Sequence, residues 1–350
     1  MSLLPALLGL VLFSFAAFTW FAHRVEVACP LQEPASVAPP ALLRHLHGAV
    51  LDDDDATIAS SSSSNGTTIP RQVFLTVKDK NTMKKWQREN LARCKRVNPG
   101  WNFNVYDDSG MDEYVTEGFP ELLDVWGFFK NVIEKKDFWS YLIVYDRGGL
   151  FMDSDIHCRR PLDELLSDSN TRGLIGVEKA DGGKLEFAQW SYAFAPRHAI
   201  PLTTLMRIKH KVEEIKAAGA SDTSAVFLTG PITWTDAILE YMYLFGMGKE
   251  TVIEAHSTAR PQDRVVGDVR LLSVNRFAAG QPHSHATRRC SHPDAFLIHQ
   301  FSGQWKNHYQ WYTADGKPPA TEKQPWWTWF PERGDNWRPR CFTIRRFDST

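Results

Sequence analysis

The sequence predicts an α/β domain in which helices cover both faces of a mostly parallel sheet. Two observations lead to this prediction: strand-like and helix-like segments alternate from residue 69 onward, and acidic residues end two of the strand-like runs. Strands that are joined through helices normally lie parallel, and ligands bind beyond their carboxyl ends. The length of 350 residues, 43% of them hydrophobic, is sufficient for one large domain or two small ones.

The elements are expected in a regular order. A buried strand is expected at 69–77 (IPRQVFLTV), where Val, Phe and Leu follow a proline, and a helix at 84–100, which stops at Asn-Pro-Gly. The alternating run 101–108 (WNFNVYDD) predicts a second strand. Apolar residues recur at helical spacing in 128–149, a helix that two glycines end, and 150–155 (LFMDSD) predicts the next strand.

The balance of charge excludes one class of partner. The chain has 40 basic and 41 acidic residues, which gives a formal net charge of -1. A surface that binds nucleic acid needs clustered positive charge to neutralise the phosphates. We therefore expect no nucleic-acid partner.

The amino-terminal segment 1–22 is apolar enough to enter a membrane. No charged residue occurs from Leu3 to Ala22, and a helix of this length spans about 30 Å, the thickness of the hydrocarbon core of a bilayer. A cleaved signal peptide is the alternative, but nothing basic precedes Leu3, and Glu26 stands where a small residue is expected. We expect an uncleaved membrane anchor.

The next segment, 23–68, is expected to be a flexible stem. It contains a run of four Asp and a run of five Ser among Pro and Ala, and it has too few apolar residues to form a core. Asn65 begins an Asn-Gly-Thr sequon, which would carry an N-glycan only if the segment faces the lumen. A chance match in a polar linker is the alternative.

The cysteines are compatible with an oxidising compartment. One or two disulfides would leave the stem cysteine, Cys29, for a bond to another chain, whereas buried free thiols are the alternative. The sequence alone does not pair them. The five cysteines are Cys29, Cys94, Cys158, Cys290 and Cys341.

Two carboxylates, Asp153 and Asp155, lie one residue apart where the strand 150–155 is expected to end. On an extended strand alternate side chains share a face, which would place them on one side, about 7 Å apart. A divalent cation or a diphosphate held with it would relieve their repulsion. A solvated turn is the alternative. A helix-loop-helix calcium site would need a glycine and a closing Glu, and glycosidase carboxylates usually come from different strands.

Six segments of the chain form an ordered series of motifs. They are IPRQVFLT, NPGWNFNVYDD, KKDFWSYLIVYDRGGLFMDSDIHCRRPLDELL, LEFAQWSYAFAPRHAI, TGPITWTDAILEY and FLIHQFSGQWK. Together they resemble glycosyltransferase family 32, and within it the initiation-specific α-1,6-mannosyltransferases of the Golgi. The resemblance predicts a catalytic domain at 69–310, followed by a Trp-rich extension at 311–350 that packs on the domain. The tryptophans of this extension include Trp326, Trp327 and Trp329.

The resemblance implies a GT-A fold, a GDP-mannose donor and Mn²⁺ as the cofactor. It implies that Asp153 and Asp155 are the catalytic residues that hold the metal and that His299 completes the site. A hydrogen-bonded core histidine is the alternative for His299. The metal would stabilise the negative charge that develops on the departing diphosphate. The family also implies a retaining reaction in which the acceptor hydroxyl attacks without a protein nucleophile.

The implied donor site contains one departure from the family pattern. Ser140 stands where the family has an arginine, and a hydroxyl cannot replace a guanidinium in kind. The choice or affinity of the donor therefore depends on Lys136, Arg147 or another base. The expected donor-binding residues are Asp137, Ser140, Tyr141, Asp153 and Gly230.

Two tryptophans, Trp190 and Trp234, are candidate walls of a sugar or acceptor site. Sugars stack their apolar faces on such rings. Packing in the hydrophobic core is the alternative for both, because buried aromatic side chains are common.

The leading hypothesis is a single-pass Golgi membrane protein whose lumenal domain transfers mannose to a protein N-glycan. One alternative is a transferase that modifies the sphingolipid inositol phosphoceramide, although no second uncharged apolar run approaching ~18 residues follows Ala22. Another is a noncatalytic subunit of a glycosyltransferase complex. Ser140 favours that alternative, whereas Asp153, Asp155 and His299 oppose it.

Overall fold

A computed structural model describes residues 68–300, apart from 169, 221–223, 259, 282–283, 285 and 288. The predicted anchor, the stem with Cys29 and Asn65, and the Trp-rich extension therefore lie outside the described residues. Within the described part of the chain, none of the helices combines the length and the apolar character needed to cross a bilayer.

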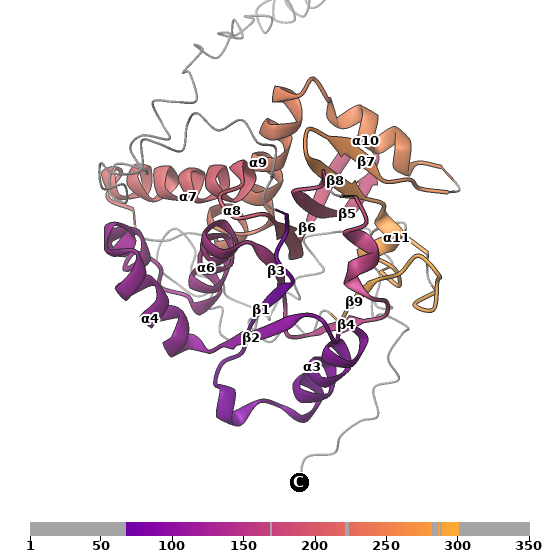
Figure 1. Ribbon diagram of the computed structural model, residues 1–350. Coiled ribbons are helices and arrows are strands. Elements are labelled where there is room, and N and C mark those ends of the chain that lie inside the picture. Colours follow the sequence, from indigo (N-terminus) through magenta and orange to yellow (C-terminus); the bar gives the residue numbers. More distant parts are fainter. Residues whose placement is uncertain are drawn as a thin grey trace, which may run out of the picture. The chain divides into compact units, whose positions relative to one another are not determined.

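A mixed sheet forms the centre of the described region (Figure 1), in the strand order β2-β1-β3-β6-β5-β8-β7. Its ladders place β1, β2, β3, β5 and β8 in one direction and β6 and β7 in the other. The expectation of a mostly parallel sheet is confirmed. The strands are β1 (Gln72–Thr76), β2 (Asn102–Tyr106), β3 (Gly149–Met152), β5 (Gly173–Asp181), β6 (Lys184–Phe194), β7 (Arg264–Val266) and β8 (Val269–Leu272).

A separate antiparallel pair, β4 (Ile156–Cys158) and β9 (Leu297–His299), lies beside the main sheet. The helices of three or more turns, with one shorter helix of eight residues, are α3 (Lys85–Val97), α4 (Asp108–Gly118), α6 (Val132–Arg147), α7 (Ala199–Ala217), α9 (Pro231–Leu244) and α10 (Lys249–His256). Single turns of helix are α5 (Leu123–Trp126), α8 (Ala225–Leu228) and α11 (Val274–Phe277), and 3₁₀ turns are Lys80–Thr82, Pro120–Leu122 and Leu162–Leu165.

Helices cover both faces of the sheet because the strands alternate their apolar side chains. On one face α6 packs against β1, β3 and β6, α9 packs against β6, and α7 contacts both helices. Phe151 of β3 faces this side and lies against Tyr192 of β6. Its neighbours Leu150 and Met152 point to the opposite face, where they join a core with Phe277 of α11.

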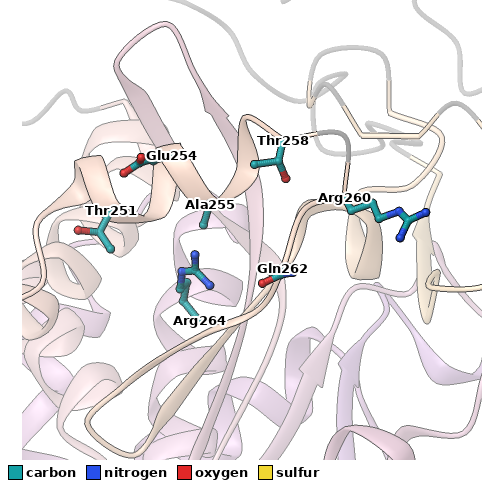
Figure 2. Close-up of a pocket in the computed structure, with 7 residues that line it drawn as sticks. All are labelled: Thr251, Glu254, Ala255, Thr258, Arg260, Gln262 and Arg264. Carbon is teal, nitrogen blue, oxygen red and sulfur yellow. The ribbon is translucent and has the colours of Figure 1, made fainter.

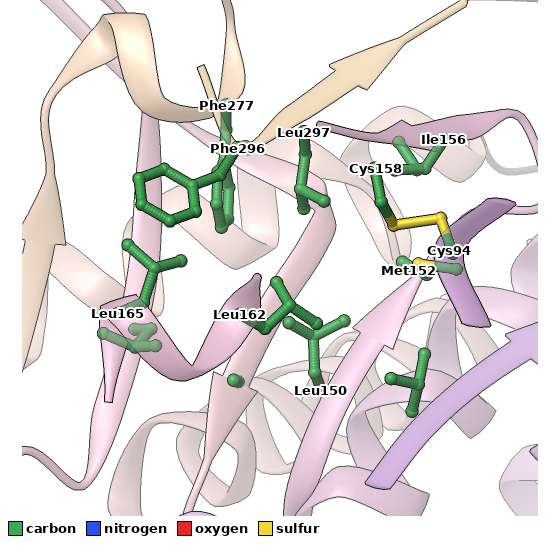
Figure 3. Close-up of a cluster of buried hydrophobic side chains, with 14 of the residues drawn as sticks. Cys94, Leu150, Met152, Ile156, Cys158, Leu162, Leu165, Phe277, Phe296 and Leu297 are labelled. Carbon is green, nitrogen blue, oxygen red and sulfur yellow. A yellow bond between two sulfur atoms is a disulfide. The ribbon is translucent and has the colours of Figure 1, made fainter. Parts of the chain in front are cut away.

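That second core carries a disulfide (Figure 3). Cys94 of α3 is bonded to Cys158 of β4, and both cysteines are fully buried beside Met152 and Ile156. The bond links residues 64 positions apart in the sequence. Restricting the unfolded chain by a loop of this size contributes about 4 kcal/mol of stability. The disulfide therefore fixes β4, and the turn that precedes it, against α3.

Two glycines make the turn between α6 and β3. Gly148 and Gly149 have φ angles of +64° and +105°. A Cβ atom at Gly149 would lie 2.6 Å from the carbonyl oxygen of Gln72 in β1. Glycine is required here because a side chain would prevent β3 from pairing with β1.

The predicted order of elements is confirmed, although each element is shorter than expected, and the difference at β3 bears on the site. The strand expected at 150–155 ends at Met152, and Asp153 begins a turn. The amide of Ile156 donates to the carbonyl oxygen of Asp153 at 3.1 Å, which closes that turn.

Candidate metal and donor site

The Asp-Ser-Asp motif occupies this turn at the carboxyl end of β3. The expectation that Asp153 and Asp155 share a face of an extended strand is therefore wrong, because the chain has already left the sheet. The amide of Asp153 donates to the carbonyl of Trp190 at 2.9 Å. Between the two acids, the hydroxyl of Ser154 accepts a hydrogen bond from Gln87 of α3 at 3.1 Å.

The β4–β9 ladder brings His299 to the turn. Ile156 is paired with His299, so the histidine lies next to the second acid of the motif. Its Nε2 atom is 3.2 Å from Oδ1 of Asp155, and each of these two residues has an exposed fraction of 7%. One potential ligand atom each from Asp153, Asp155 and His299 can be chosen so that all lie within 4.8 Å of one another.

This donor set suits a divalent cation. Carboxylate oxygens and an imidazole nitrogen are ligands that Mn²⁺ accepts, and the three come from two strand ends held by a disulfide-linked ladder. The grouping of Asp153, Asp155 and His299 is the one expected from the resemblance. The residues present therefore fit a metal of this class.

Trp190 of β6 contributes to this site through the histidine. Its ring is stacked on the imidazole of His299, with centroids 4.9 Å apart and an interplanar angle of 21°. On the core side, the indole packs near the ring of Phe277, with centroids 5.9 Å apart. With only 5% exposure, Trp190 packs against the candidate ligand and fixes the orientation of the imidazole.

Lys136 of α6 lies between two carboxylates. Its Nζ atom is 2.7 Å from Oδ1 of Asp153 and 3.4 Å from Oδ1 of Asp137. Burial alone would lower the pKa of Lys136, but the charges of Asp153 and Asp137 outweigh it and hold that pKa above its usual value. Burial raises the pKa of Asp137 to about 6, although the charge of Lys136 acts in the opposite direction.

Asp137 and Tyr141 connect α6 to the turn between α8 and α9. The hydroxyl of Thr229 donates to Oδ2 of Asp137 at 3.2 Å, and the hydroxyl of Tyr141 donates to the carbonyl of Thr229 at 2.9 Å. Gly230 follows, and a Cβ atom there would lie 2.8 Å from the carbonyl oxygen of Ala225. Gly230 is therefore enclosed by the backbone of this turn and does not lie on an open surface.

Besides Tyr141, which is fully buried, two further expected site residues lie in the core. Ser140 has no exposed surface; its hydroxyl donates to the carbonyl of Asp137 at 2.6 Å and accepts from Tyr192 at 2.8 Å. Trp234 is also fully buried, stacked on Tyr141 at 5.3 Å. In this structure, neither side chain presents an atom from which to reach a ligand.

Of the two named bases that were expected to compensate for Ser140, the structure brings Lys136 to the site. Arg147 is the last residue of α6, at the end of the helix that precedes β3, and its guanidinium pairs with Asp146 at 2.9 Å. About 15 Å of helix separates it from Asp137.

The sequence-based list of donor residues did not include Gln189. Its side chain interacts with Asp137 and opposes the effect of burial on the pKa of that acid. Gln189 lies on β6 next to Trp190, and alternation places it on the α6 side of the sheet. The amide side chain of Gln189 within the mostly apolar run FAQWSYAF was the available signal.

Two other polar features do not join the cluster. Asp107, from the acidic pair after β2, caps α4 by accepting from the amide of Gly110 at 3.0 Å. A hollow of about 670 Å³ opens between α10 and β7 (Figure 2). Its polar lining includes Glu254, Arg260 and Arg264, and neither acid of the motif lines it.

Comparison with known proteins identifies the region that contains this site. Residues 84–172 match the family described as "Glycosyltransferase sugar-binding region containing DXD motif". The resemblance to DXD glycosyltransferases is confirmed. The turn from Asp153 to Asp155 is the DXD motif of this region.

Curated relatives extend the similarity beyond the DXD region. The chain is 27% identical over 264 residues to an initiation-specific alpha-1,6-mannosyltransferase of Schizosaccharomyces pombe, covering 68% of this chain and 64% of the relative. The Candida albicans protein of the same name is 26% identical, with coverages of 60% and 64%. Inositol phosphoceramide mannosyltransferase 1 of S. pombe is 33% identical over 102 residues, 28% of this chain and 32% of that protein.

The chain thus spans less than two thirds of the length of these curated relatives. Both kinds of relative are named as mannosyltransferases; the name of the third states inositol phosphoceramide as the acceptor, whereas the name shared by the first two states only a linkage. The family match and these relatives together support a glycosyltransferase.

Proposed function

We propose that the protein is a divalent-cation-dependent, retaining glycosyltransferase with a GT-A-type fold, which transfers mannose from GDP-mannose to a protein-linked glycan. The observation that carries the proposal is the convergence of Asp153, Asp155 and His299 at the carboxyl end of β3. Ligands of α/β sheets bind at such ends. The DXD region in which the two acids lie supports a nucleotide-sugar donor.

In this proposal the three residues hold the cation, for which Mn²⁺ suits the ligand set. A bound cation stabilises the negative charge that develops on the departing diphosphate. Trp190 keeps the ring of His299 in place, and Asp137 with Gln189 offers hydrogen-bonding groups to sugar hydroxyls. We assign no protein nucleophile, because the acceptor hydroxyl itself attacks the sugar carbon.

The choice of donor and acceptor rests on the relatives. All three that are described above are named as mannosyltransferases, which supports mannose as the sugar. The similarity to the initiation-specific enzyme covers 68% of this chain, against 28% for the inositol phosphoceramide enzyme. We therefore place a protein glycan first and a sphingolipid second as the acceptor.

The Cys94–Cys158 disulfide supports a domain that folds in an oxidising compartment. Together with the apolar segment Leu3–Ala22, it supports a single-pass protein of the Golgi membrane with a lumenal domain. Asn65 would then be glycosylated, and Cys29 would be available for a disulfide with a partner. Protease treatment of intact vesicles tests this topology, since digestion of the domain without detergent would exclude it.

The direct experiment is hydrolysis of GDP-mannose, UDP-galactose and UDP-glucose by the purified protein, with and without Mn²⁺. We expect turnover of GDP-mannose that depends on Mn²⁺. Preference for a UDP-sugar would reject the proposed donor. Absence of turnover with every donor would favour the alternative of a noncatalytic subunit.

A further inference from the structure

Lys136 occupies an unusual place in the candidate site. Its ammonium approaches the same acid, Asp153, that is a candidate metal ligand, and it also approaches Asp137. The side chain of Lys136 is 14% exposed, and that of Asp137 is 4% exposed. Nζ also lies 5.3 Å from the centre of the Phe151 ring. The lysine is thus packed into the site and does not extend into solvent.

At this position the ammonium of Lys136 would repel a cation bound to Asp153. A cation held by Oδ1 of Asp153 at about 2 Å would lie within roughly 5 Å of the ammonium, since Nζ is 2.7 Å from the same oxygen. Two like charges at that distance in a partly buried site repel strongly. Binding of the cation alone is therefore opposed, unless Lys136 turns away or an anion enters between them.

The donor would supply that anion. A diphosphate carries negative oxygens that can contact a metal and an ammonium together, and Lys provides three donors on a flexible stem. To contact the donor, the ammonium of Lys136 would only exchange its present partner, the carboxylate of Asp153, for a phosphate oxygen.

We infer that Lys136 couples the two ligands: it holds Asp153 while the site is without a donor, and it passes to the donor diphosphate when the cation binds. The inference rests on the proposed function, because it assumes a cation and a nucleoside diphosphate at this site. Coupling of this kind is reciprocal, so each ligand must tighten the binding of the other by the same factor.

The test is a thermodynamic cycle on the full-length protein in detergent. Mn²⁺ is titrated with and without GDP, and GDP with and without Mn²⁺, by calorimetry; UDP is the second probe. For the wild type we expect GDP to tighten Mn²⁺ binding at least tenfold. In Lys136→Gln, which removes the charge but keeps a hydrogen-bond donor, Mn²⁺ alone should bind about tenfold more tightly. GDP binding in Mn²⁺ should weaken by roughly 10- to 100-fold.

Lys135→Gln is the matched control. The ammonium of Lys135 contacts Asp112 at 2.8 Å, which is not a member of the candidate site. This variant removes the same charge one residue away, so its affinities for Mn²⁺ and GDP, and the coupling between them, should equal those of the wild type. An equal change in both variants would mean that net charge, and not the position of Lys136, sets the affinities.

A second pair of variants covers the case in which Lys136→Gln fails to fold because Asp137 loses its partner. Asp137→Asn and the double variant Lys136→Gln/Asp137→Asn contain no such unpaired acid, and their difference isolates the lysine. Coupling that is the same with and without Lys136 would overturn the inference and leave the proposed function intact. A wild type that binds neither GDP nor UDP in Mn²⁺ would overturn both.

Discussion

Among the described residues, two aspartate–histidine pairs of almost equal length lie beyond opposite ends of the parallel strands of the main sheet. Asp155 and His299 lie 3.2 Å apart beyond the carboxyl end of β3, and Asp268 and His198 lie 3.1 Å apart before the amino end of β8. The first pair belongs to the candidate metal site. The second has the same two side chains, so the difference between them must lie in their surroundings.

The Asp268–His198 pair is closed by further hydrogen bonds. The Asp268 carboxylate also accepts from the hydroxyl of Tyr241 at 2.6 Å, and the guanidinium of Arg172 is 3.7 Å away. Nδ1 of His198 accepts from the amide of Ile200, so Nε2 carries the proton that is donated to Asp268. The carboxylate of Asp268 is thus already bound by His198 and Tyr241, which is typical of a structural hydrogen-bond network.

The Asp155–His299 pair is different because a second acid stands beside it. Asp153 brings another carboxylate within 4.8 Å, and the nearby positive charge comes from a lysine on a flexible stem. Such a group of negative charges gains from a cation, whereas the Asp268 network gains nothing from one. The comparison indicates that the charged neighbours, and not the geometry of the pair, distinguish the candidate metal site from the structural pair.

The largest effect that the comparison predicts is on transfer. Asp155→Asn keeps the volume of the side chain and removes a metal-ligand charge, so turnover should fall by at least ~100-fold while the melting temperature changes little. Asp153→Asn should behave in the same way. Donor hydrolysis and thermal unfolding measure both quantities, and near-normal turnover at limiting Mn²⁺ would show that these acids do not hold the cation.

The second largest expected effect is a loss of stability on changing the Asp268–His198 pair. Asp268→Asn removes the charge that pairs with His198 and Arg172, so the free energy of unfolding should fall by about 1 to 2 kcal/mol. Denaturant unfolding measures the change. Turnover per folded molecule should remain that of the wild type, and a large loss of turnover would contradict the structural role of this pair.

A pH titration of stability distinguishes the pairs further. The hydrogen bond from His198 lowers the pKa of Asp268 from its usual range to about 2, and Tyr241 and Arg172 act in the same direction. The folded protein therefore holds this acid ionised more strongly than the unfolded chain does. Its contribution is present above about pH 4 and is lost as the pH falls towards 2. Asp268→Asn should lack this component of acid unfolding, and an unchanged acid profile would refute its origin in Asp268.

The smallest effect is expected at the hollow between α10 and β7. Arg264 is part of its lining, whereas the acids of the DXD turn are not. Arg264→Ala should change the rate of donor hydrolysis by less than about twofold. If acceptor transfer falls while hydrolysis does not, the hollow takes part in binding the acceptor.

The sequence predicted the composition of the site better than its shape. Asp153, Asp155 and His299 could be grouped through the resemblance, although 144 positions separate Asp155 from His299. The turn at the motif was missed because Asp-x-Asp spacing fits both a strand and a turn. Only the pairing of β4 with β9 shows how the histidine reaches the acids.

The burial of Ser140 could not be predicted for a different reason. Helix α6 is buried on almost all sides, so the periodicity of apolar residues does not define a face that contacts a ligand. The ion pairs of Lys136 with Asp137 and Asp153, and the contact of Gln189 with Asp137, form only when the chain folds, so the sequence pattern does not show them. Trp190 and Trp234 illustrate the same limit: one stacks on the candidate ligand His299, and the other belongs to the core.

The measurement that tests the central claim most directly is a Mn²⁺ titration of the wild type, Asp155→Asn and Asp268→Asn in the presence of GDP. We predict one Mn²⁺ bound per chain in the wild type and in Asp268→Asn, and binding weakened by at least ~100-fold in Asp155→Asn. Equal Mn²⁺ affinity in all three folded proteins, or loss of the ion in Asp268→Asn alone, would contradict the assignment of the cation to Asp153, Asp155 and His299.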